Sequence, residues 1–465
     1  MKFSRLSTKG IALPTVIMVL LVTMTLGCIA LSLVTSQAKT EVIYEDNFIA
    51  LHSAEAGLNK YLWSLNKTSP TTIVLGTPIK YPDDNPTAEY ILSEEPGTTE
   101  MKKVIKSTGW ALSDPTVKRT IIVTFTKRSF TEFVYFSDND PSTIVWYSRD
   151  ICYGPYHTNT SLYVQGSPTF YGKVSYVLRL EDEGQTPNYK KGTERVGKRD
   201  FPTDNSELYN YADADGIIYN GRTSIFLKPN GKMDVWNLNQ TPNLKLNVDI
   251  PNDNVIYVTG TTDTDSSNKF NRDKGNVFIS GILSGRLTVA CANDIFITDY
   301  NPTLNTFSNV TETNGITYAN TTFSNPDANG DSFIQPVNAT HMLGLVANKN
   351  VCILTRGWFN DSVGNSAYSA KGDITVCAAI FAIHGKFGNS YQIASEPDTS
   401  FPDPGGILSV YGSIIQEERG AVGKTSGIGY SKRYIHDSRM LYDQPPYFLL
   451  PENTGWEINE WYEVN

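Results

Sequence analysis

An uncharged apolar segment near the N-terminus constrains this chain more than any other feature. From Ile11 to Ala38 no residue is charged, and Ile11–Val34 is almost wholly apolar. At about 1.5 Å of rise per residue, a helix over this segment is long enough to cross a hydrocarbon layer of about 30 Å. The preceding leader, MKFSRLSTKG, carries only basic charges, whereas acidic residues follow the segment. This asymmetry predicts a single-pass membrane protein with its N-terminus inside and the rest of the chain outside.

The predicted helix continues beyond the membrane as an amphipathic stalk. Pro and Gly are nearly absent between Thr15 and Asn66, so one helix of about 50 residues can start in the membrane and emerge from it. Apolar residues then recur at spacings of three, four and seven, which is typical of one stripe on a helix surface. This stripe consists of Tyr44, Phe48, Leu51, Leu58, Leu62 and Leu65. The transmembrane and stalk helix is therefore predicted over residues 11–66.

The leader and the helix together resemble a known family of bacterial membrane proteins. The leader ends in Lys9-Gly10 and is followed by IALPTVIMVLLVTM, which resembles the class III signal of type IV pilins and type II secretion pseudopilins. The closer resemblance is to the PilX-type N-terminal segment of minor pilins, whose helix carries an Ala-Glu-Ala-Gly-Leu motif, here Ala54–Leu58. The resemblance covers roughly the first 65 residues. It implies a leader of residues 1–10, cleavage between Gly10 and Ile11 by a prepilin peptidase, and contacts of the helix with membrane lipid and with other pilins or pseudopilins.

Two positions bear on how such a helix would assemble. Major pilins carry a glutamate at the fifth residue after cleavage, where this chain has Thr15. Such a carboxylate can neutralise the N-terminal ammonium of a neighbouring subunit, because an unpaired charge is costly in an apolar medium. Its absence predicts a specialised subunit rather than the repeating shaft subunit. Glu55 lies on the apolar stripe, and we expect it to pair with another subunit or with the head domain, with a solvated edge position as the alternative.

Three other interpretations of the N-terminus stay open from the sequence. A cleaved secretory signal would normally have an apolar region of only about 7–15 residues. A lipoprotein signal ending at Cys28 would need an aliphatic residue where Thr25 stands, and the apolar run continues to Val34. A plain single-pass anchor without an assembly role fits the same run. The pilin-like interpretation is favoured because the leader and the Ala54–Leu58 motif occur together.

The rest of the chain predicts β-structure in two regions. Residues 67–130 form a small β-rich region expected to pack on the stalk, and residues 131–465 form a large β-rich domain outside the membrane. In the large domain, apolar pairs such as Val277/Ile279 and Leu287/Val289 recur about eight to ten residues apart, which favours a β-solenoid over a sandwich. The predicted fold class is therefore α+β: a long N-terminal transmembrane and stalk helix followed by a large, mostly-β exported domain.

The large domain also resembles an uncharacterised bacterial domain that is often found behind PilX-type N-termini. The matching blocks are Gly154–Asn159, Tyr411–Gly423, Gly429–Met440 and Gln444–Phe448. This resemblance implies an architecture and no activity. His157 lies in the first block, and we expect it to make a hydrogen bond that holds the turn after Pro155, because no nucleophile or acid is tied to it as catalysis requires.

No catalytic residue and no resident cofactor is predicted, so we expect no enzymatic activity. The segment Gly420–Thr425 contains Gly-Lys-Thr, but a phosphate-binding loop needs glycine where Glu418 stands. Asp327, Asn329 and Asp331 place oxygen ligands on alternate residues, so a calcium site is the alternative to an ordinary polar loop there. The net charge of −9 argues against nucleic acid as a partner.

The cysteines outside the apolar segment can be assigned to faces by strand parity. Cys291 shares parity with Leu287 and Val289, so we expect it to face inward. Cys352 and Cys377 alternate with apolar neighbours, so we expect both to face out of the core. There they form a disulfide if their strands are adjacent, and otherwise they stay free thiols.

These features predict a minor pilin or pseudopilin-like structural subunit that takes part in assembling a type IV pilus or a type II secretion-like filament. The alternative is an exported β-helix enzyme or a binding module acting on cell-surface polysaccharide. Clustered carboxylates about 5–10 Å apart would favour the enzyme, and an exposed aromatic patch would favour the binding module.

Overall fold

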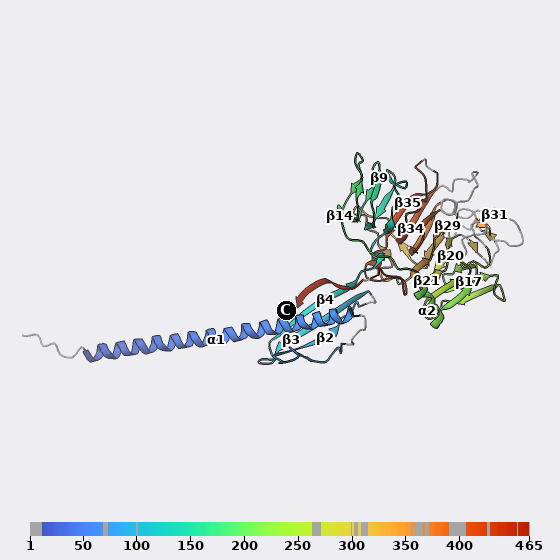
Figure 1. Ribbon diagram of the computed structural model, residues 1–465. Coiled ribbons are helices and arrows are strands. Elements are labelled where there is room, and N and C mark those ends of the chain that lie inside the picture. Colours follow the sequence, from blue (N-terminus) through green and yellow to red (C-terminus); the bar gives the residue numbers. More distant parts are fainter. Residues whose placement is uncertain are drawn as a thin grey trace, which may run out of the picture. The chain divides into compact units, whose positions relative to one another are not determined.

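The computed structural model divides the chain into two compact units (Figure 1). It describes residues 12–67, 73–98, 101–262, 271–298, 300–301, 306–307, 315–354, 357–358, 366–367, 372–389, 406–425, 428–452 and 454–464. The first unit comprises Met1–Thr126 and Gly455–Asn465, and the second comprises Lys127–Thr454. The second unit is therefore inserted into the chain of the first.

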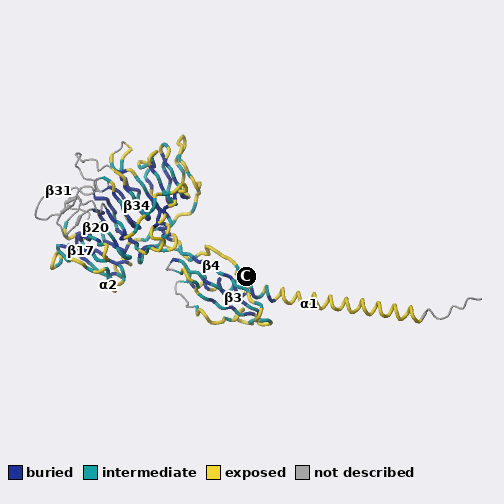
Figure 2. The backbone as a smooth tube through the Cα atoms, turned by 180° about the vertical axis from the view of Figure 1, so that it is seen from behind, coloured by how far each residue is buried: buried dark blue, intermediate teal, exposed yellow. Residues whose placement is uncertain are grey.

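Helix α1 (Ala12–Leu65) is continuous, as the sequence predicts, and is the one described helix long and apolar enough to span a membrane. Its side chains are exposed on every face from Leu13 to Glu45 (Figure 2). The polar side chains of this part bond back to the helix, because the hydroxyls of Thr23, Thr25 and Thr35 donate to carbonyl oxygens four residues earlier. These residues therefore bring no unpaired hydroxyl into an apolar medium.

A five-stranded sheet completes the first unit, and the C-terminal part of α1 packs on it. In spatial order its strands are β1 (Ile79–Tyr81), β2 (Ala88–Glu94), β3 (Lys102–Ala111), β4 (Lys118–Lys127) and β36 (Trp456–Val464). Strands β1 to β4 pair antiparallel. Alternate residues of β4, namely Ile121, Val123 and Phe125, are buried in one apolar cluster with Ala54 and Leu58 of the helix.

The C-terminal strand corrects a boundary drawn from the sequence, which assigned residues 131–465 to the large domain. Strand β36 instead joins the sheet of the first unit beside β4. The side chain of Asn66, at the end of α1, donates to the carbonyl oxygen of Trp456 at 3.0 Å and accepts from its backbone N–H at 2.6 Å. Arg119 of β4 also forms an ion pair with Glu463. These contacts join residues that lie far apart in sequence, so local patterns could not predict them.

The second unit is a β-solenoid, as the sequence favours. Its coils are built from β5 (Tyr135–Asn139), β6 (Trp146–Tyr147), β7 (Ile151–Tyr153), β8 (Tyr156–Thr158), β9 (Leu162–Gln165), β10 (Thr169–Phe170), β11 (Val174–Tyr176), β12 (Leu180–Glu181), β13 (Asn188–Tyr189), β14 (Thr193–Arg195), β15 (Ile217–Asn220), β16 (Thr223–Leu227), β19 (Val255–Thr259), β20 (Val277–Leu283), β21 (Arg286–Cys291), β22 (Ile295–Ile297), β25 (Gly315–Tyr318), β28 (Met342–Ala347), β29 (Val351–Ile353), β32 (Ile374–Ala382), β33 (Phe387–Asn389), β34 (Ile407–Glu418) and β35 (Ser431–His436). Short antiparallel additions are β17 (Lys232–Asn237), β18 (Leu244–Asp249), β23 (Tyr300–Asn301), β24 (Thr306–Phe307), β26 (Thr322–Phe323), β27 (Ile334–Gln335), β30 (Gly357–Trp358) and β31 (Ser366–Ala367).

The coils stack through parallel ladders. One ladder runs β15-β19-β21-β28-β32-β34-β5-β8-β11-β14. A second runs β20-β25-β32-β34-β35-β7-β10-β13, and a third runs β16-β20-β22-β29-β33. Parallel pairing of successive coils distinguishes a solenoid from a sandwich of antiparallel sheets.

The inward-facing residues of the ladders form one apolar core. Val277, Ile279, Leu287 and Val289 are all buried in it, as their alternation predicts, and so is Cys291. Outward-facing residues of the first ladder form a second buried cluster with helix α2 (Ser206–Asp215), which packs on β19. The solenoid wall beneath α2 is therefore apolar on both faces.

The coils do not stack in chain order. The last coil pairs with the first one, because β34 lies beside β5 and β35 lies beside β7. The chain thus builds a first stack of coils from β5 to β14 and then a second stack from β15 to β35. The last coil of the second stack pairs with the first coil of the first stack. We call this junction the seam. The connections β5–β7 and β34–β35 are neighbours there, although they are far apart in sequence.

Candidate functional site

The predicted processing site, Gly10 and Ile11, lies outside the described residues. The described helix begins directly after it, and Thr15 lies on its exposed surface. Large apolar side chains are exposed along this part of the helix, from Leu13 at 71% to Val34 at 60%. Such a long apolar surface needs lipid or other helices around it, because contact with water is unfavourable.

Small residues form the contact between α1 and its sheet. Ala50, Ser53, Ala54 and Gly57 are buried at helical spacing on the face toward the sheet. The hydroxyl of Ser107 on β3 donates to the carbonyl oxygen of Ala54 at 2.8 Å. The Ala54–Leu58 motif therefore supplies the short side chains that let the helix backbone approach β3 within hydrogen-bonding distance.

Two glycines show how close this approach is. A Cβ atom at Gly109 of β3 would lie 2.6 Å from the backbone nitrogen of Ala54, and closer still to the Ala50 carbonyl oxygen and the Ser53 hydroxyl. A Cβ atom at Gly57 would lie 2.8 Å from Cε2 of Tyr90. The helix motif could be recognised in the sequence but the role of Gly109 could not, because a single glycine in a strand gives no sign of its partner helix.

The C-terminal part of the predicted apolar stripe packs on the sheet, whereas its N-terminal part is exposed. Tyr44 is 73% exposed and Phe48 is 63% exposed, whereas Leu58 is buried. Tyr44 belongs to the part of the helix that is exposed on every face, whereas Leu51 and Leu62 are half-buried against the cluster that contains Leu58. Glu55 pairs with His52 of the preceding turn at 3.5 Å, with more than a third of both side chains exposed. An exposed pair of this kind contributes little to stability.

His157 lies in β8 and is fully buried, with both ring nitrogens hydrogen-bonded. Its Nδ1 is 2.8 Å from the Ser175 hydroxyl, and its Nε2 is 2.9 Å from Oδ1 of Asn159. The ring also stacks on Phe136, with 4.6 Å between centroids. Burial lowers the pKa of His157 to about 4. A neutral, fully bonded imidazole of this kind ties neighbouring coils together and is not arranged as a general base.

The residues weighed for calcium form an ordinary turn. The Oδ1 atom of Asp327 accepts the backbone N–H groups of Asn329 at 2.8 Å and Asp331 at 3.0 Å. Across the described part of the chain, no group of three or more His, Cys, Asp or Glu side chains is placed to hold a metal ion. Calcium binding by this turn stays an untested prediction.

Cys352 and Cys377 are not joined by a disulfide in the structure, and the sequence made such a bond conditional on adjacent strands. Cys352 lies in β29, which pairs with β22 and β33, whereas Cys377 lies in β32, which pairs with β25, β28 and β34. Cys377 belongs to the inner core, so its expected outward direction is wrong. Burial raises the pKa of its thiol far above the usual value, which makes it a poor nucleophile.

The Gly-Lys-Thr segment at 423–425 lies in the connection between β34 and β35. It leads into a strand and not into a helix, so the strand-to-helix geometry of a phosphate-binding loop is missing.

No protein-family model matches the chain, and no curated protein matches its sequence. Among solved structures, the chain is similar to the competence-associated pilin ComZ from Thermus thermophilus, with 9% sequence identity. The match covers 90% of this chain and 98% of that chain, with a TM-score of 0.28. Such a low TM-score leaves the function to be argued from the residues and contacts of this chain.

Proposed function

We propose that the protein is a minor pilin or pseudopilin-like structural subunit of a type IV pilus or a type II secretion-like filament. Before assembly it resides in the bacterial cytoplasmic membrane, with its N-terminus inside and its β-rich units outside. The observation that carries this proposal is the uncharged part of α1, which is exposed on every face and continues without a break into a helix packed on a sheet.

The exposed helix gives a physical route to assembly. A prepilin peptidase would remove residues 1–10, and the helix from Ile11 would then exchange contacts with lipid for contacts with other helices. Thr15 supplies no carboxylate for the ammonium of a neighbouring subunit, so the protein acts as a specialised subunit and not as the shaft. The close packing of α1 on its sheet would keep the helix attached to the first unit while the solenoid is displayed outside.

A native cysteine provides the test. Cys28 is exposed in the apolar part of α1, whereas Cys152, Cys291 and Cys377 are buried. A membrane-permeant reagent with a thiol-reactive maleimide at one end and a photoactivated diazirine at the other, applied to intact membranes, should therefore join Cys28 to whichever subunit lies beside it. We expect an adduct whose second component carries a pilin-type N-terminal helix, and no adduct from the matched Cys28→Ser variant.

Two results would count against the proposal. If Cys28 cross-links to no other subunit in cells that assemble filaments, the protein is a plain membrane anchor. A Cys28 blocked by a lipid would indicate a lipoprotein.

A further inference from the structure

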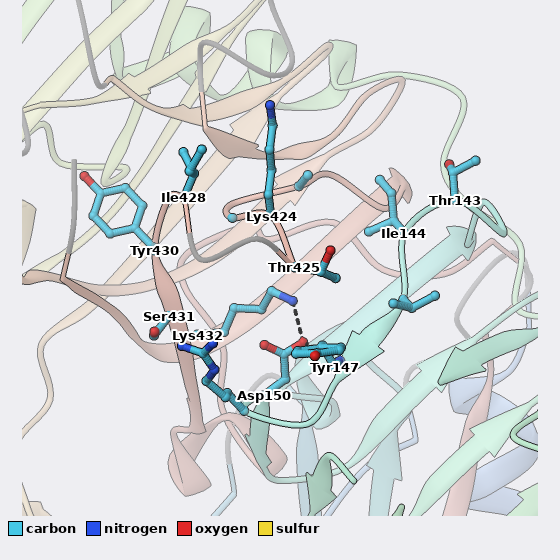
Figure 3. A pocket seen from close by; sticks show the side chains of 15 residues that line it. Thr143, Ile144, Tyr147, Asp150, Lys424, Thr425, Ile428, Tyr430, Ser431 and Lys432 are labelled. Carbon is cyan, nitrogen blue, oxygen red and sulfur yellow. Dashed lines mark hydrogen bonds and ion pairs between the residues drawn. The ribbon is translucent and has the colours of Figure 1, made fainter. Parts of the chain in front are cut away.

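The seam holds a pocket of about 440 Å³ between the first and last coils (Figure 3). One wall comes from the β5–β7 connection, including Tyr147, Arg149 and Asp150, and the other comes from the β34–β35 connection with Lys424 and the start of β35 with Lys432. Its volume lies in the usual range for small-molecule sites. The two walls meet only because the last coil of the solenoid stacks on its first coil.

A buried ion pair forms the floor of this pocket. The Nζ atom of Lys432 donates to Oδ2 of Asp150 at 2.6 Å, and the two side chains are only 12% and 10% exposed. The same carboxylate oxygen accepts the backbone N–H of Tyr147 at 2.9 Å. In Figure 3 Lys432 reaches across to Asp150, whereas Lys424 extends away from this pair. The only carboxylate that lines the described pocket is therefore already bonded from two sides.

A second cation lies in the core beside this floor. Arg419 is 1% exposed, and its guanidinium lies 4.6 Å from the centroid of the Trp146 ring. Its Nη2 donates to the carbonyl oxygen of Val145, a residue of the pocket wall, at 3.2 Å, while its buried Nη1 has no hydrogen-bond partner among the described residues. The ammonium of Lys432 lies 5.4 Å from the same ring centroid. Burial, with Arg419 acting in the same direction, lowers the pKa of Lys432 to about 8.

The charges around the pocket do not balance. Arg149, Lys424 and Lys432 line it against the single carboxylate of Asp150, although the whole chain carries a net charge of −9. Arg149 and Lys424 form no ion pair with any described residue. The carboxylate of Asp140, the other acid near Arg419, is bonded to the hydroxyls of Ser137 and Tyr156 deeper in the core. An anion entering the pocket would supply the missing negative charge.

We propose that the seam pocket binds an acidic sugar unit, with its carboxylate or phosphate group near Arg149 and Lys424. Besides cations, the lining offers the hydroxyls of Thr143, Thr425 and Ser431 and the ring of Tyr147. Hydroxyls pair with sugar hydroxyls and aromatic faces cover sugar rings, whereas a bare ion would use neither. The proposal does not depend on assembly into a filament, so it can fail or hold independently of the proposed function.

Titration calorimetry on the full chain in detergent tests the proposal at low salt. The probes are a galacturonic acid disaccharide, glucose 6-phosphate, a neutral glucose disaccharide and inorganic phosphate. We expect at least one acidic sugar to bind, the neutral sugar not to bind, and the double variant Arg149→Gln/Lys424→Gln to weaken binding about tenfold, since exposed cations act mainly through screened attraction. The matched control is Lys190→Gln, which removes an exposed lysine elsewhere on the solenoid.

Three results would overturn the proposal. They are no binding of either acidic sugar to the unmodified chain, equal weakening by the control variant, and binding of inorganic phosphate as tight as that of the sugars. The two acidic probes distinguish a carboxylate from a phosphate as the recognised group.

Discussion

The two units reach a stable core by opposite means. In the first unit, Gly57, Gly109 and small helix residues let backbones approach closely, and the enclosed cluster is apolar. In the second unit, stacked coils enclose an apolar core that also holds charged groups at the seam, including Arg419 and Asp140. The stability of the first unit therefore depends on small side chains between helix and sheet, whereas the stability of the seam depends on buried charges that are paired.

Removing one charge at the seam should have the largest effect. We expect Asp150→Asn to destabilise the strands around the seam by about 3 kcal/mol, because it leaves the buried ammonium of Lys432 beside Arg419 without a carboxylate. Hydrogen exchange of the β34 and β35 amides measures this loss. The double variant Asp150→Leu/Lys432→Met should recover most of it, and equal protection in the single variant and the unmodified chain would contradict the role of paired charge.

Adding volume between helix and sheet should have the next largest effect. Gly109→Val should destabilise the first unit by about 2 kcal/mol, because the new side chain overlaps the α1 backbone. We expect faster hydrogen exchange in β2 and β3 with unchanged exchange in the solenoid. The control is Gly197→Ala, where an added Cβ atom meets nothing within 4 Å. Similar exchange in the Gly109 and Gly197 variants would show that the close approach does not matter.

The solenoid should also lose stability in acid, because it contains buried histidines. The pKa of His157 is about 4 in the folded solenoid, below the value of 6.5 usual for histidine, so the unfolded chain binds the extra proton between these values. The free energy of unfolding should therefore fall as the pH falls from about 6.5 to about 4, by up to about 1.4 kcal/mol per pH unit for this residue. The pKa values of His341 and His436 are also lowered, mainly by burial, and act in the same direction.

The variant His157→Gln measures how much this one histidine contributes to the pH dependence of the free energy of unfolding. Its unfolding free energy, followed by solenoid tryptophan fluorescence, should depend less steeply on pH than that of the unmodified chain. Lys190→Gln, which alters an exposed residue of the same unit that stays charged over this pH range, should leave the slope unchanged. Parallel pH curves for all three proteins would show that His157 does not titrate as described.

Local patterns in the sequence were enough to predict the helix and the inward faces of β20 and β21, but not the direction of Cys377 in β32. The long stretch without proline predicts α1, and the alternation at Val277/Ile279 predicts which side chains enter the solenoid core. The face of α1 that meets the sheet could not be predicted, because it is set by the close approach of Ala50 and Ala54 to Gly109, a residue far away in sequence.

Pairings between distant segments could not be predicted in the same way. Strand β36 alternates like any strand, but its place beside β4 depends on contacts such as Arg119 with Glu463. The seam is also non-local, because no strict repeat in the sequence reveals that β34 and β35 stack on β5 and β7. The seam pocket was therefore missed, and the Gly-Lys-Thr segment on its wall was considered only as a phosphate-binding loop.

The mass of the N-terminus of the membrane-bound protein tests the central claim most directly. A pilin-like subunit should begin at Ile11 after cleavage behind Gly10, and replacing Gly10 should abolish this processing while leaving the protein in the membrane. An intact Met1, or a mature chain that begins at a lipidated Cys28, would contradict the account.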